Sequence, residues 1–423
     1  MAAVAHTSSH ALVETVSCGD PLRIPTLARE LTRRYMIWDG YVGGVRRVAL
    51  HPLVLPLSLH IAAKDAAESV TQAVRAVSQR AFHDPHERGL YGLSASVEQL
   101  AEASHDAGDE ASLVRVDLLL GEDGGVHACE INADCPGGHN EALGLPHLAR
   151  AAGYMAGSNP TVVVEALTRR LEQMAQGAAV ALIFATAYAE DLQVCALLQR
   201  ELQKRGVTAL LAPATAPVRV GNEVHVLGVP VRVLYRYFPT EYMEGQANLA
   251  GVAEAVSRGE LCTLTSFAHI YEQSKFAFAR AWHVKDTLSD DDRRAIQHHV
   301  PATFDLRDIP SCDLVAEREE WVVKRAYGRV GDEVFVGPLL KAAEWTTLVE
   351  TVRRKCEQGE SWIAQRFVRQ RPVPTPWGPR YVTLGAYVLD GTFVGYFARV
   401  TPESHVSHGA LCVPVFHLPD GEA

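Results

Sequence analysis

The sequence predicts a mixed α/β protein in which an α/β layer and an α+β layer share one chain. Near residue 180, almost continuous apolar segments alternate with an amphipathic helix, which is the β-α-β rhythm of an open sheet. From about residue 270, helices, a glycine-containing strand pair and a late hairpin follow one another, as in an α+β layer. At 423 residues the chain exceeds one ordinary core, so we expect two or three packed units.

Composition and charge exclude several classes of protein. The residues are 48% apolar and 21% charged, the balance of a soluble globular protein. A net charge of −10 argues against a nucleic-acid surface, which needs a basic face. The N-terminal stretch resembles no secretory signal, and no apolar run is long enough to span a membrane. The eight cysteines form no CxxC pair, so we expect reduced thiols and a cytoplasmic protein rather than a zinc site.

The first part of the chain reads as Ala-rich helices on either side of a short hairpin. Gly, Ser, Asn and Pro interrupt the pattern at 156–160, which suggests a boundary. We expect helices at 61–81, 94–105, 143–155 and 161–176, and the hairpin at 115–132.

An open α/β layer is predicted over about 178–240. Its first strand, AVALIFAT, is almost wholly apolar, as expected of a strand buried on both faces. No Gly-rich turn follows this strand, so it is not a typical dinucleotide site. The expected elements are a strand at 179–186, a helix ending at Gly206, a strand at 207–213, a hairpin turning at Gly221-Asn222 and a strand at 229–239.

The last third predicts a separate α+β layer. Its final hairpin has Asp390-Gly391, a favoured two-residue turn, between its strands. The other expected elements are helices at 274–282, 286–300 and 344–359, a strand–loop–strand unit at 321–337 and a strand at 362–373.

The hairpin RVDLLLGEDGGVHACEIN carries an unusual set of polar residues. If Asp123-Gly124 forms a two-residue turn, Asp117 lies opposite Glu130 and Arg115 lies opposite Asn132. Val116 and Ile131, and likewise Leu118 and Cys129, then face the core.

Directly opposed carboxylates repel, so something must compensate Asp117 and Glu130. Mg²⁺ is the natural candidate because it prefers hard oxygen ligands together with substrate phosphates, which Arg115 could also meet. The simpler alternative is that Arg115 only neutralises the two carboxylates in a surface cluster. A longer turn would also change the alignment.

A second polar feature is WVVKRAYGRVG, in which Lys324 ends an apolar strand and a glycine-containing loop follows. Such a loop brings backbone N–H groups to phosphates and the lysine adds charge, although no Walker A pattern is present. A solvated lysine is the simpler interpretation. The later strand WIAQRFV could offer backbone groups of 365–368 to an adenine edge, although it also resembles an ordinary edge strand.

Taken in order, these motifs resemble a circularly permuted ATP-grasp protein of the glutathionylspermidine synthase-like group. The resemblance spans roughly residues 110–415, and no single motif is decisive. Its motifs are Arg115-Val116-Asp117, Glu130-Ile131-Asn132, the Tyr235–Glu241 segment, Lys275, the Val-Pro-x-Thr segment at 300–303, Lys324 with its loop, the Gln365 strand and Arg399.

The resemblance implies a site for ATP and Mg²⁺. The implied metal ligands are Asp117, Glu130 and Asn132, and the implied catalytic residues are Arg115, which faces the transferring phosphoryl group, and Lys324. The implied nucleotide-binding residues are Lys275, Lys324, Gly328, Gly331, Gln365, Arg366, Phe367, Val368 and Arg399. Some relatives have an acidic ligand in the glycine loop, which is absent here unless Asp332 or Glu333 replaces it, so the number of metal ions stays open.

The same resemblance implies three regions. Residues 1–160 would carry the magnesium-binding hairpin, 161–268 a pre-ATP-grasp α/β domain, and 269–423 the nucleotide-binding lobe with the C-terminal core strands.

The implied activity is ATP-dependent ligation of a small-molecule carboxylate to an amine through an acyl phosphate. His139 could assist the amine, although a structural histidine is commoner, and Trp38, Asp39 and Tyr41 could contribute to substrate recognition. A catalytically degenerate nucleotide-binding partner protein and a small-molecule phosphotransferase are the alternatives. We expect no nucleic-acid or membrane partner, and a homodimer is the default expectation.

Overall fold

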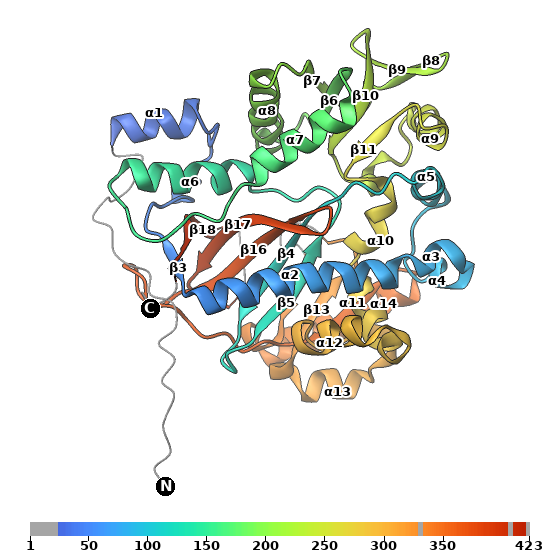
Figure 1. Ribbon diagram of the computed structural model, residues 1–423. Coiled ribbons are helices and arrows are strands. Elements are labelled where there is room, and N and C mark those ends of the chain that lie inside the picture. The colour runs from blue at the N-terminus through green and yellow to red at the C-terminus, as the bar shows by residue number, and fades with distance from the viewer. Residues whose placement is uncertain (1–23, 329–332, 405–408, 420–423) are drawn as a thin grey trace.

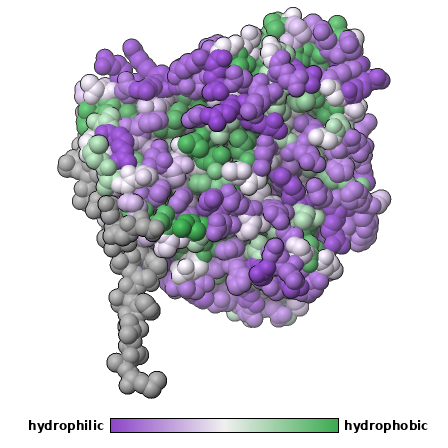
Figure 2. Space-filling model, viewed as in Figure 1, coloured by the Kyte–Doolittle hydropathy of each residue, from purple (hydrophilic) through white to green (hydrophobic). Residues whose placement is uncertain are grey.

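The computed structural model describes residues 24–328, 333–404 and 409–419. The predicted mixed α/β fold is confirmed, with three principal sheets and helices between and around them (Figure 1). Hydrophilic residues cover most of the face seen in Figure 1, as Figure 2 shows. Within the described residues, no helix combines the length and the apolar character needed to cross a bilayer.

A five-stranded antiparallel sheet, called here the central sheet, joins distant parts of the chain. The early hairpin of β4 and β5 joins the late strands because β4 pairs with β16. The predicted hairpin turn at Asp390-Gly391 is confirmed, since Leu389 pairs with Thr392. In sheet order the strands are β18 (Leu411–Val413), β17 (Thr392–Thr401), β16 (Tyr381–Leu389), β4 (Leu113–Leu120) and β5 (Val126–Asn132).

One face of the central sheet packs on α2 (Leu57–Ser78), which crosses the sheet in Figure 1. Side chains alternate between the faces of a strand, so Val114, Val116 and Leu118 enter the core shared with α2. The buried stripe of α2 consists mainly of Ala and Val, whose small side chains allow a close approach. The opposite face of the sheet is therefore left for Arg115 and Asp117.

The predicted β-α-β unit is confirmed as a second sheet, called here the parallel layer. The turn at Gly221-Asn222 is also confirmed, because Val220 pairs with Glu223. The strands are β7 (Ala209–Pro213), β6 (Ala179–Phe184), β10 (Val229–Tyr237), β9 (Glu223–Val226) and β8 (Val218–Val220), with β11 (Cys262–Leu264) beside β10. The sequence did not predict β11, because a strand this short shows no alternation of apolar and polar residues.

The third sheet, called here the lysine sheet, contains β12 (Thr303–Asp305), β15 (Trp362–Arg366), β13 (Trp321–Arg325) and β14 (Val334–Val336) in that order. The interpretation of WIAQRFV as an edge strand is wrong, because β15 pairs with β12 on one side and β13 on the other. Two small pairs complete the strands: β1 (Tyr41–Val42) with β2 (Val45–Arg46), and β3 (Leu53–Leu55) with β19 (Val415–His417).

The remaining helices cover these sheets and connect them. The predicted helix at 143–155 begins earlier than expected, at His139. The helices are α1 (Pro25–Arg33), α3 (Arg80–His83), α4 (Pro85–Gly89), α5 (Ala95–Asp106), α6 (His139–Ala151), α7 (Val163–Ala175), α8 (Ala189–Lys204), α9 (Leu249–Ser257), α10 (Ile270–Gln273), α11 (Phe276–Val284), α12 (Asp290–His299), α13 (Ser311–Ala316) and α14 (Ala342–Glu357).

A buried ion pair connects the parallel layer to the end of β5. Arg236 of β10 binds Asp134 at 2.6 Å, and both side chains are 0% exposed. The remaining capacity of Asp134 is filled by the backbone N–H of Thr240 at 2.9 Å and its hydroxyl at 2.7 Å. Arg236 in turn donates to the carbonyl of Phe238. Both terminal nitrogens of Arg236 and both oxygens of Asp134 are thus hydrogen-bonded, as a buried charge pair needs, while Arg236 Nε has no partner among the residues that the structure describes.

Replacing Asp134 with Asn should therefore be costly, because it leaves a buried guanidinium without its counter-charge. We expect Asp134→Asn to lower the free energy of unfolding by about 3–5 kcal/mol in urea titrations. The control is Glu165→Gln, which removes the exposed ion pair with Arg169 and should cost about 0–1 kcal/mol. Equal losses in the two variants would contradict the structural role assigned to Asp134.

Candidate nucleotide and metal site

The polar hairpin residues meet on the central-sheet face away from α2. The predicted pairing is confirmed at this end of the hairpin: Asp117 lies opposite Glu130, and Arg115 lies opposite Asn132. Val116 and Ile131 pair on the other face, also as predicted. The two carboxylates therefore stand side by side, where like charges repel.

The predicted two-residue turn at Asp123-Gly124 is wrong. The N–H of Gly121 bonds to the carbonyl of Gly125, and Gly124 has a positive φ of 81°, as in a three-residue loop with a glycine in the left-handed region. This loop moves the register by one residue, so Leu118 pairs with Ala128 and not with Cys129. A β-bulge at Cys129 moves it back, which is why Asp117 still faces Glu130.

Asp117 is held by two arginines from different strands. Arg115 binds it through two nitrogens, at 2.7 and 3.0 Å, and Arg399 of β17 adds a bond at 2.7 Å. Asp117 is only 4% exposed. Burial alone would raise the pKa of Asp117, but Arg115 and Arg399 overcome this effect and lower it to about 2. The carboxylate is therefore ionised at neutral pH.

Glu130 and Asn132 extend the cluster toward Lys275. In the amide orientation that satisfies both neighbours, Asn132 donates to Glu130 at 3.1 Å and accepts from Arg115 at 3.3 Å. Lys275 is 3% exposed, lies 3.6 Å from Glu130 and donates to the carbonyl of Gly328 at 2.6 Å. The start of the glycine loop thus lies next to the carboxylates.

Lys324 is buried and not solvated, so the simpler interpretation of this lysine is wrong. Its Nζ donates to the carbonyl of Cys129 at 2.8 Å and to Gln365 Oε1 at 2.7 Å. Gln365 donates in turn to the hydroxyl of Thr303 at 3.1 Å. Burial lowers the pKa of Lys324, while Cys129 and Glu130 act in the opposite direction. The lysine sheet therefore contacts the bulge of the central sheet directly.

Two backbone N–H groups in the segment 365–368, which the resemblance assigns to nucleotide binding, already make hydrogen bonds within the protein. The N–H groups of Arg366 and Phe367 donate to the carbonyls of Ala302 and Glu320, so an adenine that used them would have to replace these bonds. Gly331 and Asp332 lie outside the described residues. Glu333 binds Arg325 at 3.0 Å and lies 3.5 Å from Lys355, so it is occupied by these cations.

Sequence reasoning missed residues that make room for Arg115. A Cβ at Gly385 of β16 would come 2.7 Å from Arg115 Cδ, so only glycine lets this side chain cross the strand. The carbonyl of Gly137 accepts from Arg115 at 2.8 Å and from the hydroxyl of Tyr387 at 2.5 Å. A glycine inside a strand was the available signal, because it often marks a close approach.

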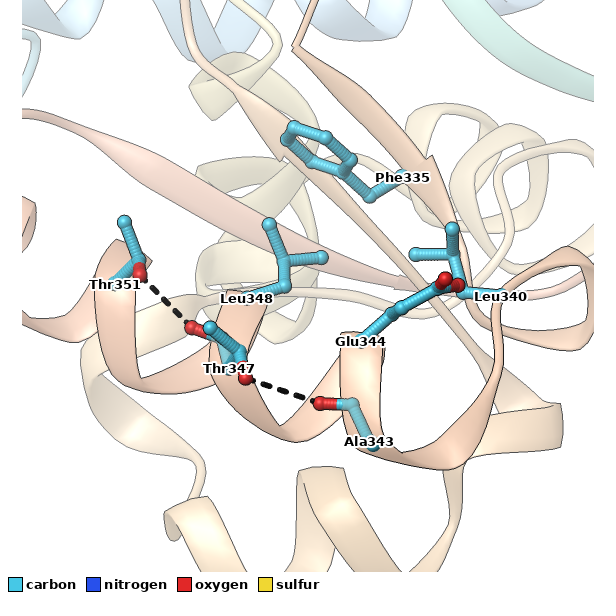
Figure 3. Close-up of a pocket in the computed structure, with 7 residues that line it drawn as sticks. All are labelled: Phe335, Leu340, Ala343, Glu344, Thr347, Leu348 and Thr351. Atoms are coloured by element: carbon cyan, nitrogen blue, oxygen red, sulfur yellow. Dashed lines mark hydrogen bonds between the residues drawn. The ribbon is translucent and has the colours of Figure 1, made fainter.

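A hollow of about 550 Å³ lies elsewhere, between β14 and α14 (Figure 3). It contains none of the predicted site residues. Its walls are Phe335, Leu340, Ala343, Glu344, Thr347, Leu348 and Thr351. The hydroxyls of Thr347 and Thr351 bond to helix carbonyls, as the dashed lines in Figure 3 indicate. The hollow is thus a feature of the outer surface of the lysine sheet.

The oxygen-rich set on the central sheet fits Mg²⁺. Asp117, Glu130 and Asn132 supply carboxylate and amide oxygens, the donors that this ion prefers. The direct opposition of two carboxylates is itself an arrangement that a divalent cation stabilises.

Comparisons with known proteins place the chain in a family. The family model described as glutathionylspermidine synthase pre-ATP-grasp matches residues 60–416. A glutathione synthetase-like effector from Globodera pallida, solved in its apo form, is 13% identical, with a TM-score of 0.53 over 93% of this chain and 98% of that chain. A candidate gamma-glutamylcysteine synthetase from Methylobacillus flagellatus KT is 13% identical, with a TM-score of 0.42 over 82% and 84%. No curated protein matches the sequence.

The low pKa of Asp117 makes its contribution to stability depend on pH. Because the folded pKa lies below the unfolded value, the contribution is complete above about pH 5 and is lost as the pH falls toward 2. With EDTA present, we expect Asp117→Asn to be less stable than the wild type by about 2 kcal/mol at pH 7. In urea titrations this difference should shrink between pH 4 and pH 2.

The matched control is Asp286→Asn on the exposed turn Lys285–Thr287, which should match the wild type at every pH. A difference for Asp117→Asn that stays constant from pH 7 to pH 2 would show that the arginines do not stabilise the ionised form.

Proposed function

Because the chain belongs to the glutathionylspermidine synthase pre-ATP-grasp family, we propose that it is an ATP-dependent carboxylate–amine ligase. Family membership indicates synthetase-like ligase chemistry and an ATP-grasp-related fold. The finer proposal is that an acyl phosphate forms and an amide bond follows, with ATP converted to ADP and phosphate.

The motif order supports a circularly permuted ATP-grasp core as part of this proposal. The hairpin strands β4 and β5 precede the lysine sheet in the chain, yet β4 pairs with β16, which follows that sheet. We accordingly propose that the chain is divided into three regions, 1–160, 161–268 and 269–423. The metal ligands lie in the first region, and Lys275 and Lys324 lie in the third.

The observation that supports the proposal best is the meeting of four cations with a carboxylate pair. Arg115 and Arg399 contact Asp117, and Lys275 lies beside Glu130. Lys324 completes the set through its bond to the Cys129 carbonyl. Cations fixed in this way are suited to bind phosphates and to stabilise charge on a transferring phosphoryl group.

In this proposal Asp117, Glu130 and Asn132 would hold Mg²⁺. Bound Mg²⁺ would neutralise and orient the ATP phosphates. Lys275 and Lys324 would bind phosphate oxygens, and Arg115 would face the γ-phosphoryl group while Gly385 keeps the space for its side chain.

The chemistry needs positioning and charge stabilisation but no nucleophilic side chain. A substrate carboxylate oxygen attacks the γ-phosphorus, and ADP leaves. The amine nitrogen then attacks the acyl carbon, inorganic phosphate leaves, and the amine loses a proton. Arg115 and the lysines would offset the negative charge that develops in both steps.

Calorimetric titration of ATP, with and without Mg²⁺, tests the metal and phosphate roles. We expect the wild type to bind ATP only weakly without Mg²⁺. Glu130→Gln removes one charged oxygen ligand and should weaken MgATP binding by about 10–100-fold. Glu122→Gln is the matched control, because it changes an exposed carboxylate at the tip of the same hairpin and should leave the affinity unchanged.

The outcomes separate the candidate functions. Equal ATP affinity with and without Mg²⁺ would contradict the metal site and favour a nucleotide-binding partner protein. MgATP binding followed by ADP release that needs a carboxylate but no amine would instead identify a phosphotransferase.

A further inference from the structure

Gln273, the last residue of α10, holds the end of β5. Its Oε1 accepts hydrogen bonds from the backbone N–H groups of Ala133 and Asp134, at 2.9 and 3.1 Å. These two residues directly follow Asn132, at which β5 ends. Gln273 is 2% exposed, and Ala133 and Asp134 are 0% and 1% exposed, so water does not readily replace the glutamine oxygen. One side-chain oxygen thus fixes the backbone next to the candidate metal ligands.

The chain that starts at Gln273 reaches the lysine sheet within two residues. The backbone N–H of Lys275 donates to the carbonyl of Ala326, which directly follows β13, at 2.9 Å. Lys275 Nζ donates to the carbonyl of Gly328 at 2.6 Å and lies 3.6 Å from Glu130. The segment 273–275 is therefore attached to the end of β5 by its first residue and to the lysine sheet by its last.

The short helix α10 is itself anchored, so Gln273 projects from a fixed base. Arg75 of α2 donates to Glu272 Oε1 at 3.0 Å, and His269 Nδ1 lies 2.7 Å from the same oxygen. Arg75 also donates to the hydroxyl of Ser112 at 2.8 Å, one residue before β4 begins. Glu272 and His269 are both buried. These contacts hold α10 against α2 and against the start of β4.

The end of β5 has a second attachment, which does not involve Lys275. The carboxylate of Asp134 binds Arg236 in the parallel layer. Loss of the Gln273 oxygen would leave this attachment in place, but it would leave two buried N–H groups unpaired, which is unfavourable. The backbone after Asn132 would then shift to find other acceptors, and the candidate metal ligands would move relative to Lys275.

We infer that Gln273 is a positioning residue that fixes the distance between the metal ligands Glu130 and Asn132 and the phosphate-binding Lys275. The inference rests on the proposed function, which gives those three residues their roles. Mg²⁺ and Lys275 must reach oxygens of the same triphosphate, so the ATP affinity gained from Mg²⁺ depends on their separation. Groups that orient metal ligands commonly contribute about 10–100-fold to metal affinity.

The test measures ATP affinity by calorimetry on the full chain with and without Mg²⁺, and the ratio of the two affinities is called here the Mg²⁺ gain. Gln273→Met keeps the length of the side chain but has no oxygen acceptor, so it should reduce the Mg²⁺ gain about tenfold or more. Its ATP affinity without Mg²⁺ should match that of the wild type, because Lys275 keeps its own bonds to the lysine sheet. Gln273→Glu keeps an oxygen that can accept from both N–H groups, so it should retain most of the Mg²⁺ gain.

The matched control is Gln193→Met in α8. Gln193 is also buried, and its Oε1 accepts a hydrogen bond from the backbone N–H of Trp38 at 2.9 Å. Both methionine variants should therefore unfold at lower urea concentrations than the wild type, but Gln193→Met should keep the full Mg²⁺ gain. A purely structural role for Gln273 would lower stability alone. Equal losses of Mg²⁺ gain in the two methionine variants would overturn the inference.

The wild type separates this inference from the proposed function. If wild-type ATP affinity does not depend on Mg²⁺, the metal site of the proposed function fails and the inference fails with it. If the wild type shows a Mg²⁺ gain that Gln273→Met retains, the inference alone is overturned. A loss in Gln273→Glu as large as that in Gln273→Met overturns it too, because the acceptor oxygen would then not be the cause. If Gln273→Met does not fold, Gln273→Asn decides, since its shorter side chain withdraws the oxygen from both N–H groups, and a full Mg²⁺ gain in that variant overturns the inference.

Discussion

The β-bulge at Cys129 is the constraint on which the candidate site depends. The loop at the tip of the hairpin shifts the pairing of β4 and β5 by one residue, and the bulge reverses the shift before the strands reach Asp117 and Glu130. Without it, a different residue would stand opposite Asp117. The same extra residue leaves its carbonyl outside the ladder, where Lys324 of the lysine sheet donates to it. One irregularity thus aligns the carboxylates and connects two sheets.

The arginines around Asp117 show how the protein itself offsets the repulsion between the opposed carboxylates. Arg115 binds Asp117 through two nitrogens and Arg399 through one, so the nearest positive charges come from the protein itself. Arg115 thus neutralises Asp117, one of the two carboxylates that the simpler interpretation named, and both residues are buried rather than on the surface. A carboxylate offers about four lone-pair sites, so Asp117 retains acceptor capacity for a metal ion.

The sequence predicted those parts that depend on local pattern and missed those that depend on distant packing. The Asp390-Gly391 turn and the β-α-β rhythm follow from turn chemistry and periodicity. The Cys129 bulge could not be predicted, because it compensates a loop length that the sequence left open. The burial of Lys324 could not be predicted from the local sequence either, because it depends on Gln365 and on a carbonyl from another sheet.

The two lysines connect separate parts of the site. Lys324 uses the Cys129 carbonyl across the sheets, and Lys275 uses the Gly328 carbonyl at the start of the glycine loop. Both lysines already donate hydrogen bonds to these carbonyls. A phosphate oxygen that approached either lysine would therefore have to replace a carbonyl oxygen as the acceptor. The free energy gained is then the difference between an ammonium–phosphate bond and an ammonium–carbonyl bond, which is smaller than the strength of the ammonium–phosphate bond alone. This exchange favours phosphate over the carbonyl, because phosphate brings a full negative charge. That charge stabilises the ammonium form of Lys324, which burial destabilises.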